Sequence, residues 1–415
     1  MNDGPLVHDW NVEEFETLAW GRHVELDDET LRDGLQSPSV TDPPVGAKIE
    51  LLHMMDELGI HTANIGLPGA GPRAVADITR LCEEIRDAEL SITANCAVRT
   101  VLADVQPAAR ISQRTGVPIE VCAFIGSSPI RLFAEGWTID GMLHTAEESV
   151  SFAVREGLPV MFVTEDTTRA DGETLKALYG NAIRWGVRRI CLSDTVGHAT
   201  PSGVRSLIRF VKREIVDPSG ANVKIDWHGH RDRGLGLANA LVAIEAGADR
   251  IHATAMGIGE RVGNVQMDLL LVNLALAGVH DADLTQLADY CELVSRECGV
   301  PLPRNYPVLG DDAFRTATGV HAAAIVKAQA KGANWLADRV YSGVPAAMVG
   351  RRQEIEIGPM SGISNVRYWL ARRGYDSDDT ALCRRIFARA KKSDHTLTED
   401  EVLGIVHGAG AEPAA

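Results

Sequence analysis

Two histidines separated by one glycine, His228 and His230, are the strongest local signal for chemistry in this chain. On a β-strand, residues i and i+2 point to the same side, so both imidazoles can reach one ion. Two histidines and a carboxylate form a common site for a divalent metal with open coordination positions. Asp33, which follows another strand-like run, is the expected third ligand. The alternative interpretation is a strand-end histidine pair bonded to backbone groups.

The elements that position these residues are short, nearly continuous apolar runs, each followed by a helical pattern. Runs of this kind are typical of parallel strands that are buried on both faces. Eight of them occupy residues 23–26, 62–66, 91–98, 119–125, 159–166, 188–195, 223–230 and 250–259. Eight such units predict an α/β fold, a (β/α)8 TIM barrel. A doubly wound open sheet is the alternative, but no GxGxxG follows the first run.

Polar residues gather where several of these runs end. They form the segments DETLRDGLQ, TEDTTR, SDTVGHATP and HGHRD, after the first, fifth, sixth and seventh runs. In a barrel these ends converge on one face, where active sites are built. We therefore expect Asp33, His228 and His230 to meet there.

The rest of the chain has a different pattern. We expect an N-terminal arm at residues 1–22, the barrel at 23–280, helical accessory subdomains at 281–407 and a disordered tail at 408–415.

The net charge of −16 argues against nucleic acid as a partner. No apolar run suits a membrane span, and the acidic N-terminus does not resemble a signal peptide, so we expect a cytoplasmic protein. The seven cysteines form no CxxC pair and are expected to be free and buried.

Several of these segments resemble the DRE-TIM metallolyase superfamily, in particular its 2-isopropylmalate synthase and homocitrate synthase branch. The similar segments are LDDETLRDGLQSP, FIGSSPIR, VTEDTTRADGETL, LSDTVGHATP, HGHRDRGLGLANALVAIEAGADRIHATAMGIGERVGN and FRTATGVHAAAIVK. The resemblance implies a Claisen condensation of acetyl-CoA with a 2-oxo acid, followed by thioester hydrolysis. The product would be a 2-alkylmalate-type or homocitrate-type acid and CoA.

A divalent cation (Mg, Mn or Zn) would stabilise the negative charge that forms on the ketone oxygen. Asp33, His228 and His230 would hold it, and Asn264 would complete or support the shell. Arg32 would stabilise the developing oxyanion with charge-assisted hydrogen bonds.

The resemblance also implies roles in substrate binding and proton transfer. Thr195 matches a threonine that binds the substrate carboxylate, although it could instead cap the following helix. Glu165 matches a glutamate at the acyl-CoA site. His321, and with it Tyr341, matches an accessory-domain residue that is supplied to the neighbouring subunit's barrel, which implies a homodimer.

The variable end of the 2-oxo acid would meet polar side chains at the ends of strands two, three and four. The candidates are Asn64, Asn95, Arg99 and Arg131, and Gln36 is a further expected substrate-binding residue. A cationic residue there would suit a second acidic group. The two arginines could equally contact CoA phosphates or lie on the rim.

Two other functions are alternatives. RDGLQ, with Leu35, is the pattern of hydroxymethylglutaryl-CoA lyases, which cleave a carbon–carbon bond, but the glycine-rich cysteine loop of those lyases is missing. A catalytically silent barrel would require loss of the metal ligands or Arg32, all of which are present.

Overall fold

The computed structural model describes Leu6, His8 and residues 23–408. The expected N-terminal arm at 1–22 and tail at 408–415 lie outside the described residues, apart from Leu6, His8 and Gly408. The chain divides into two compact units, residues 1–283 with 289–301 and residues 284–288 with 302–415.

Eight parallel strands form the centre of the first unit and pair in chain order into a closed barrel. The closure confirms the TIM barrel and excludes the doubly wound sheet. The strands are β1 (Glu25–Asp28), β2 (Thr62–Asn64), β3 (Thr93–Arg99), β4 (Ile119–Gly126), β5 (Val160–Glu165), β6 (Arg189–Asp194), β7 (Lys224–Gly229) and β8 (Arg250–Ala253).

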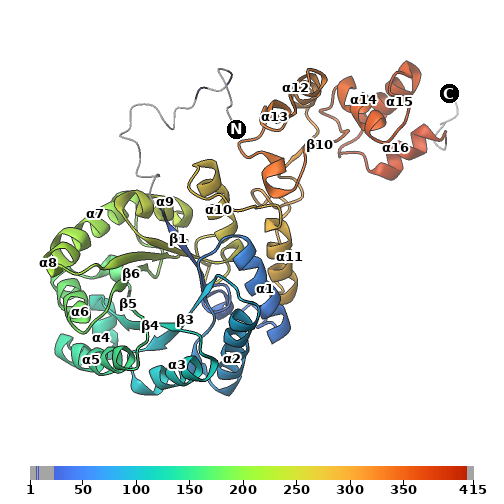
Figure 1. The fold of residues 1–415 in the computed structure, drawn as a ribbon. Helices are drawn as coiled ribbons and strands as arrows, with labels where there is room; N and C mark the ends of the chain where they lie inside the picture. The colour runs from blue at the N-terminus through green and yellow to red at the C-terminus, as the bar shows by residue number, and fades with distance from the viewer. Residues whose placement is uncertain (1–5, 7, 9–22, 409–415) are drawn as a thin grey trace. The chain divides into compact units, whose positions relative to one another are not determined.

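Helices follow the strands and surround the barrel (Figure 1). They cover the apolar outer face of the strands and leave the barrel mouth to the connecting loops. The helices are α1 (Val45–Glu57), α2 (Pro72–Asp87), α3 (Leu102–Thr115), α4 (Pro129–Glu135), α5 (Ile139–Arg155), α6 (Gly172–Arg184), α7 (Pro201–Val211), α8 (Asp217–Ser219), α9 (Gly236–Ala246), α10 (Met267–Leu276) and α11 (Leu287–Cys298).

The first strand lies two residues further along the chain than its predicted run, and its last two residues are aspartates. Both are fully buried and both have partners. Asp27 accepts hydrogen bonds from Thr62 Oγ1 at 2.6 Å and Asn95 Nδ2 at 2.8 Å. Asp28 accepts from the backbone N–H of Thr30 and from the hydroxyl of Tyr290. Partners far away in the sequence therefore allow buried acids within a strand.

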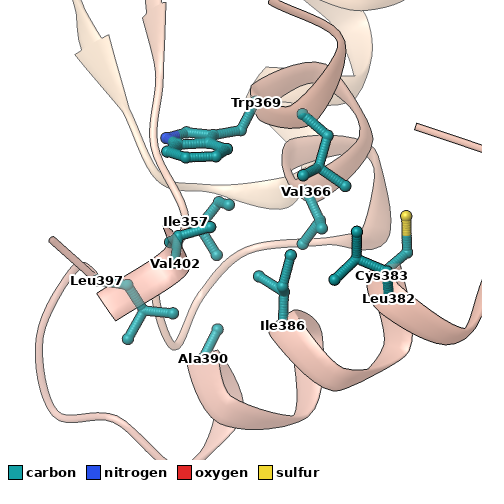
Figure 2. Packing of buried hydrophobic residues seen from close by; sticks show 10 residues of the cluster. Ile357, Val366, Trp369, Leu382, Cys383, Ile386, Ala390, Leu397 and Val402 are labelled. Atoms are coloured by element: carbon teal, nitrogen blue, oxygen red, sulfur yellow. The ribbon is translucent and has the colours of Figure 1, made fainter. Parts of the chain in front are cut away.

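The second unit is built from short helices and one two-stranded parallel sheet. Its core contains Trp369, Ile386 and Val402, which pack between its last three helices (Figure 2). The elements are β9 (Arg315–Thr316), α12 (Gly319–Ala330), α13 (Asn334–Ala337), β10 (Glu354–Ile355), α14 (Ile363–Arg372), α15 (Thr380–Lys391) and α16 (Glu399–Val406).

All seven cysteines are free and buried, as expected. Burial raises the pKa of Cys122 and Cys191 well above the usual thiol range, so both are neutral thiols at pH 7. In the described part of the chain, no helix combines the length and the apolar character that crossing a membrane requires.

Candidate active site

A cavity of about 370 Å³ opens at the carboxyl ends of the barrel strands. Polar side chains converge there because the parallel strands all end at this face. Eight of the residues predicted from the sequence line it: Arg32, Asp33, Gln36, Asn64, Glu165, Thr195, His228 and His230.

The three predicted metal ligands lie together. The Nε2 atoms of His228 and His230 are 3.3 Å apart, and His230 Nε2 is 3.6 Å from Asp33 Oδ2. Burial and the neighbouring His228 lower the pKa of His230 to about 4, so its imidazole is neutral at pH 7, as a metal ligand must be. Ligands about 2.1 Å from one ion lie roughly 3 Å apart, which matches these spacings.

Asn264 supports this group. Its Nδ2 donates to Asp33 Oδ2 at 2.6 Å and to the carbonyl of Ile258 at 3.1 Å, and its backbone pairs with that of His230. Its buried Oδ1 has no hydrogen-bond partner among the described residues. A Cβ on Gly259 would lie 2.3 Å from Asn264 Nδ2, so only glycine permits this approach. Two facing imidazoles, a carboxylate and a free amide oxygen fit a divalent cation.

Glu29, which is not among the predicted site residues, contacts both Arg32 and His228. It accepts from Arg32 Nη2 at 2.5 Å, and its other oxygen is 2.7 Å from His228 Nδ1. Burial raises the pKa of Glu29, but the charges of Arg32, His228 and His252 outweigh burial and hold that pKa well below its usual range. Glu29 therefore orients the imidazole of His228 so that Nε2 faces the site.

His252 on β8 is a second cavity residue that is not among the predicted site residues. Its Nε2 is 2.9 Å from Asp226 Oδ2, and its Nδ1 is 3.4 Å from Glu29 Oε1. Burial lowers the pKa of His252, but Asp27, Glu29 and Asp226 outweigh it and raise that pKa to about 10. Both residues lie within the similar sequence segments, and alternation places Glu29 on the same side as Asp27 and His252 on the same side as Arg250.

Arg32 and Asp33 form an ion pair of 2.8 Å. Burial lowers the pKa of Arg32, but Glu29 and Asp33 outweigh it and raise that pKa above its usual value. The buried Nε of Arg32 has no partner among the described residues.

Thr195 and Glu165 lie on the rim of the cavity. The hydroxyl of Thr195 accepts from the backbone N–H of Asp166 at 2.8 Å, which leaves its own proton free to donate. Glu165 ends β5 and lies 3.3 Å from Arg131 Nε. Burial raises the pKa of Glu165 although Arg131 opposes the shift.

Arg99 and Arg131 are not brought into this cavity. Both line a neighbouring cavity of about 680 Å³, which shares Phe124 and Glu165 with the first. Arg99 is paired with Asp104 at 2.7 Å.

His321 and Tyr341 lie in the second unit, where their rings stack with centroids 3.8 Å apart. Tyr341 is 48% exposed, so a ligand or protein surface can reach this pair.

Comparison with known proteins gives a consistent picture. A sequence model of the HMGL-like family matches residues 23–294. The chain is 30% identical to a homocitrate synthase of Saccharolobus islandicus, over 89% of this chain and 76% of that protein. It is 31% identical to a probable 2-isopropylmalate synthase of Methanopyrus kandleri, over 86% of this chain and 68% of that protein.

Among solved structures, the HMG-CoA lyase from Brucella melitensis has a similar fold. The TM-score is 0.55 at 19% identity, over 66% of this chain and 98% of the lyase. A likeness at this identity shows the barrel fold alone.

Proposed function

The chain belongs to the HMGL-like family and to its group of 2-isopropylmalate and homocitrate synthases, and from this membership we propose that it condenses acetyl-CoA with a 2-oxo acid. Hydrolysis of the thioester would then release CoA and a 2-alkylmalate-type or homocitrate-type acid. One observation carries the proposal: Asp33, His228 and His230 meet beside Arg32 in one cavity at the barrel mouth.

The first requirement of this reaction is stabilisation of charge on the ketone oxygen. A divalent cation (Mg, Mn or Zn) held by Asp33, His228 and His230, with Asn264 in support, would supply Lewis-acid stabilisation there. Arg32, which lines the same cavity, would donate to this oxygen as the new carbon–carbon bond forms.

The second requirement is a fixed orientation of the 2-oxo acid. The hydroxyl proton of Thr195 would donate to the substrate carboxylate, since its oxygen already accepts from Asp166. Gln36 and Asn64 would provide further polar contacts. The buried Oδ1 of Asn64 has no partner among the described residues.

The third requirement is a base for the methyl group of acetyl-CoA. Glu165 would take this proton, and the methyl carbon would attack the ketone carbon as the ketone oxygen becomes an alkoxide. The raised pKa of Glu165 makes it a stronger base than an ordinary carboxylate. Arg131, which lies beside Glu165, and Arg99 line the adjoining cavity, where they would bind the anionic CoA.

His321 and Tyr341 would complete the site from the partner subunit of a homodimer. Their stacking in the second unit supports a joint role, because the two rings already lie together.

The experiment follows free thiol release from acetyl-CoA with a panel of 2-oxo acids and added Mg²⁺, Mn²⁺ or Zn²⁺. We expect release with at least one 2-oxo acid, and its loss in Asp33→Ala and His230→Ala. His144→Ala is the matched control, because His144 is an exposed histidine on α5 and not a cavity residue. Retained activity in Asp33→Ala would contradict the metal-site assignment.

Hydroxymethylglutaryl-CoA lyase activity is the alternative outcome of this assay. Leu35, the residue that resembles the lyases, lines a separate cavity of about 300 Å³ and does not line the site cavity. Cleavage of a 3-hydroxyacyl-CoA, with no thiol release from acetyl-CoA and any 2-oxo acid, would refute the condensation.

A further inference from the structure

The site cavity has a polar side and an apolar side. The polar side comes from the segment after β1 and from the ends of β6, β7 and β8, and it holds the candidate ligands, Glu29, Ser193 and His252. The opposite wall comes from the strands across the barrel, and its side chains are Ala97 of β3, Cys122 and Phe124 of β4, and Met161 and Val163 of β5. Strand alternation explains this wall, because these residues share the inner face of their strands.

The two arginines of the site cavity are already paired. Arg32 donates to Glu29 and Asp33 through its two terminal nitrogens. Arg261 donates to both carboxylate oxygens of Asp232, at 2.8 and 3.1 Å, and to the carbonyl of Thr195. Arg32 is the cation that the proposed function assigns to the ketone oxygen. No lysine is found among the described residues that line the cavity.

The other two candidate cations, Arg99 and Arg131, do not line this cavity. Arg99 forms a two-point pair with Asp104, at 2.7 and 2.9 Å, and Arg131 is 3.0 Å from Glu135. Glu29 and Glu165 line the site cavity as well. A second carboxylate directed at β3, β4 and β5 would therefore face Glu165 and apolar carbon, and both described arginines that line the cavity already have a carboxylate partner.

The proposed metal ligands in the segment after β1 and at the end of β7, with Thr195 after β6, would hold the groups common to all 2-oxo acids. The variable end must then extend toward β3, β4 and β5, which lie across the closed barrel. We propose that this end is an uncharged aliphatic group that contacts Ala97, Phe124 and Val163. Burying methylene groups there is favourable, whereas burying an unpaired carboxylate is costly. This inference rests on the proposed condensation and names its substrate class.

The direct test compares two substrates with equal numbers of non-hydrogen atoms, 2-oxoglutarate and 5-methyl-2-oxohexanoate. The second replaces the distal carboxylate with an isopropyl group. We expect kcat/KM for the uncharged acid to be at least about 100-fold higher, because a desolvated polar group without a partner is strongly rejected. Equal or better use of 2-oxoglutarate would overturn the inference.

That result would leave the proposed condensation standing, because thiol would still be released. If no 2-oxo acid released thiol, the condensation itself would be wrong. Calorimetric titration of the two acids in the presence of Mg²⁺ would then decide the inference, since preferential binding of the uncharged acid supports it and preferential binding of 2-oxoglutarate overturns it.

Two variants test the contact residues. Val163→Lys places a cation on the apolar wall and should shift the kcat/KM ratio toward 2-oxoglutarate by at least about tenfold, whereas the control Val163→Met should not. Ala97→Leu reduces the space beside the apolar wall. It should lower kcat/KM for 5-methyl-2-oxohexanoate about tenfold more than for the smaller pyruvate. Circular dichroism shows whether each variant folds. If Val163→Lys does not fold, the substrate ratio of Ala97→Leu decides whether this wall contacts the variable end. An unchanged substrate ratio in the folded variants would overturn the assignment of this wall.

Discussion

Glu29→Gln should weaken metal binding although Glu29 is not one of the three proposed ligands. In the wild-type protein, Glu29 Oε2 is 2.7 Å from His228 Nδ1, and its lowered pKa keeps it ionised at pH 7. A carboxylate at this position keeps the proton on Nδ1 and directs the Nε2 lone pair of His228 toward Asp33 and His230. Glutamine retains the size of the side chain but removes the charge that stabilises this tautomer.

The magnitude follows from the contacts that are lost. Replacing the carboxylate that orients a metal-bound histidine typically weakens metal affinity about 10- to 100-fold, or about 1.4–2.7 kcal/mol. Glu29 also pairs with Arg32 at 2.5 Å, but Arg32 keeps Asp33 as a partner at 2.8 Å. We therefore expect a folded variant with a moderate loss of stability, on the order of 2–3 kcal/mol.

The assay is calorimetric titration of the metal-free protein with Mn²⁺, which reports affinity without turnover. Glu165→Gln is the matched control, because Glu165 also lines the cavity but its ion pair is with Arg131 and not with a proposed ligand. Glu165→Gln should bind Mn²⁺ as the wild type does. Wild-type affinity in Glu29→Gln, within about twofold, would refute the claim that Glu29 orients His228.

Three further predictions follow from the same structure. Mg²⁺ at about 100 times its Kd should raise the free energy of unfolding by about 2.7 kcal/mol, and chemical denaturation should show no such gain in Asp33→Ala. Burial raises the pKa of Asp28 to about 6, so the folded protein holds this proton more tightly than the unfolded chain does, and wild-type stability falls as pH rises through that range. Relative to wild type, Asp28→Asn should gain about 2–3 kcal/mol in the free energy of unfolding between about pH 4 and pH 8, and a pH-independent difference would contradict the assignment. Co-expression of Asp33→Ala with His321→Ala, each inactive alone, should restore about a quarter of the wild-type activity if His321 acts in the partner's barrel; no recovery in verified mixed dimers would exclude this exchange.

The sequence was sufficient to predict the barrel and three residues of its candidate metal site. The eight apolar runs correspond to the eight strands because a parallel strand buried on both faces leaves a local signal that does not depend on its partners. His228 and His230 are two residues apart on one strand end, so their common direction also follows from local geometry. Asp33 joins them because strands of a closed barrel deliver their carboxyl ends to one face.

The tertiary structure alone decided which other side chains share the cavity. Glu29 and His252 lie within the similar sequence segments but were not among the predicted site residues. Their roles depend on contacts with Arg32, His228 and Asp226, which only the folded geometry reveals. Pairing of Arg99 with Asp104 depends likewise on how the loop after β3 turns back. Residue type and spacing therefore predicted the fold and the candidate ligands, whereas the tertiary structure alone shows which charged side chains of the cavity are paired with one another.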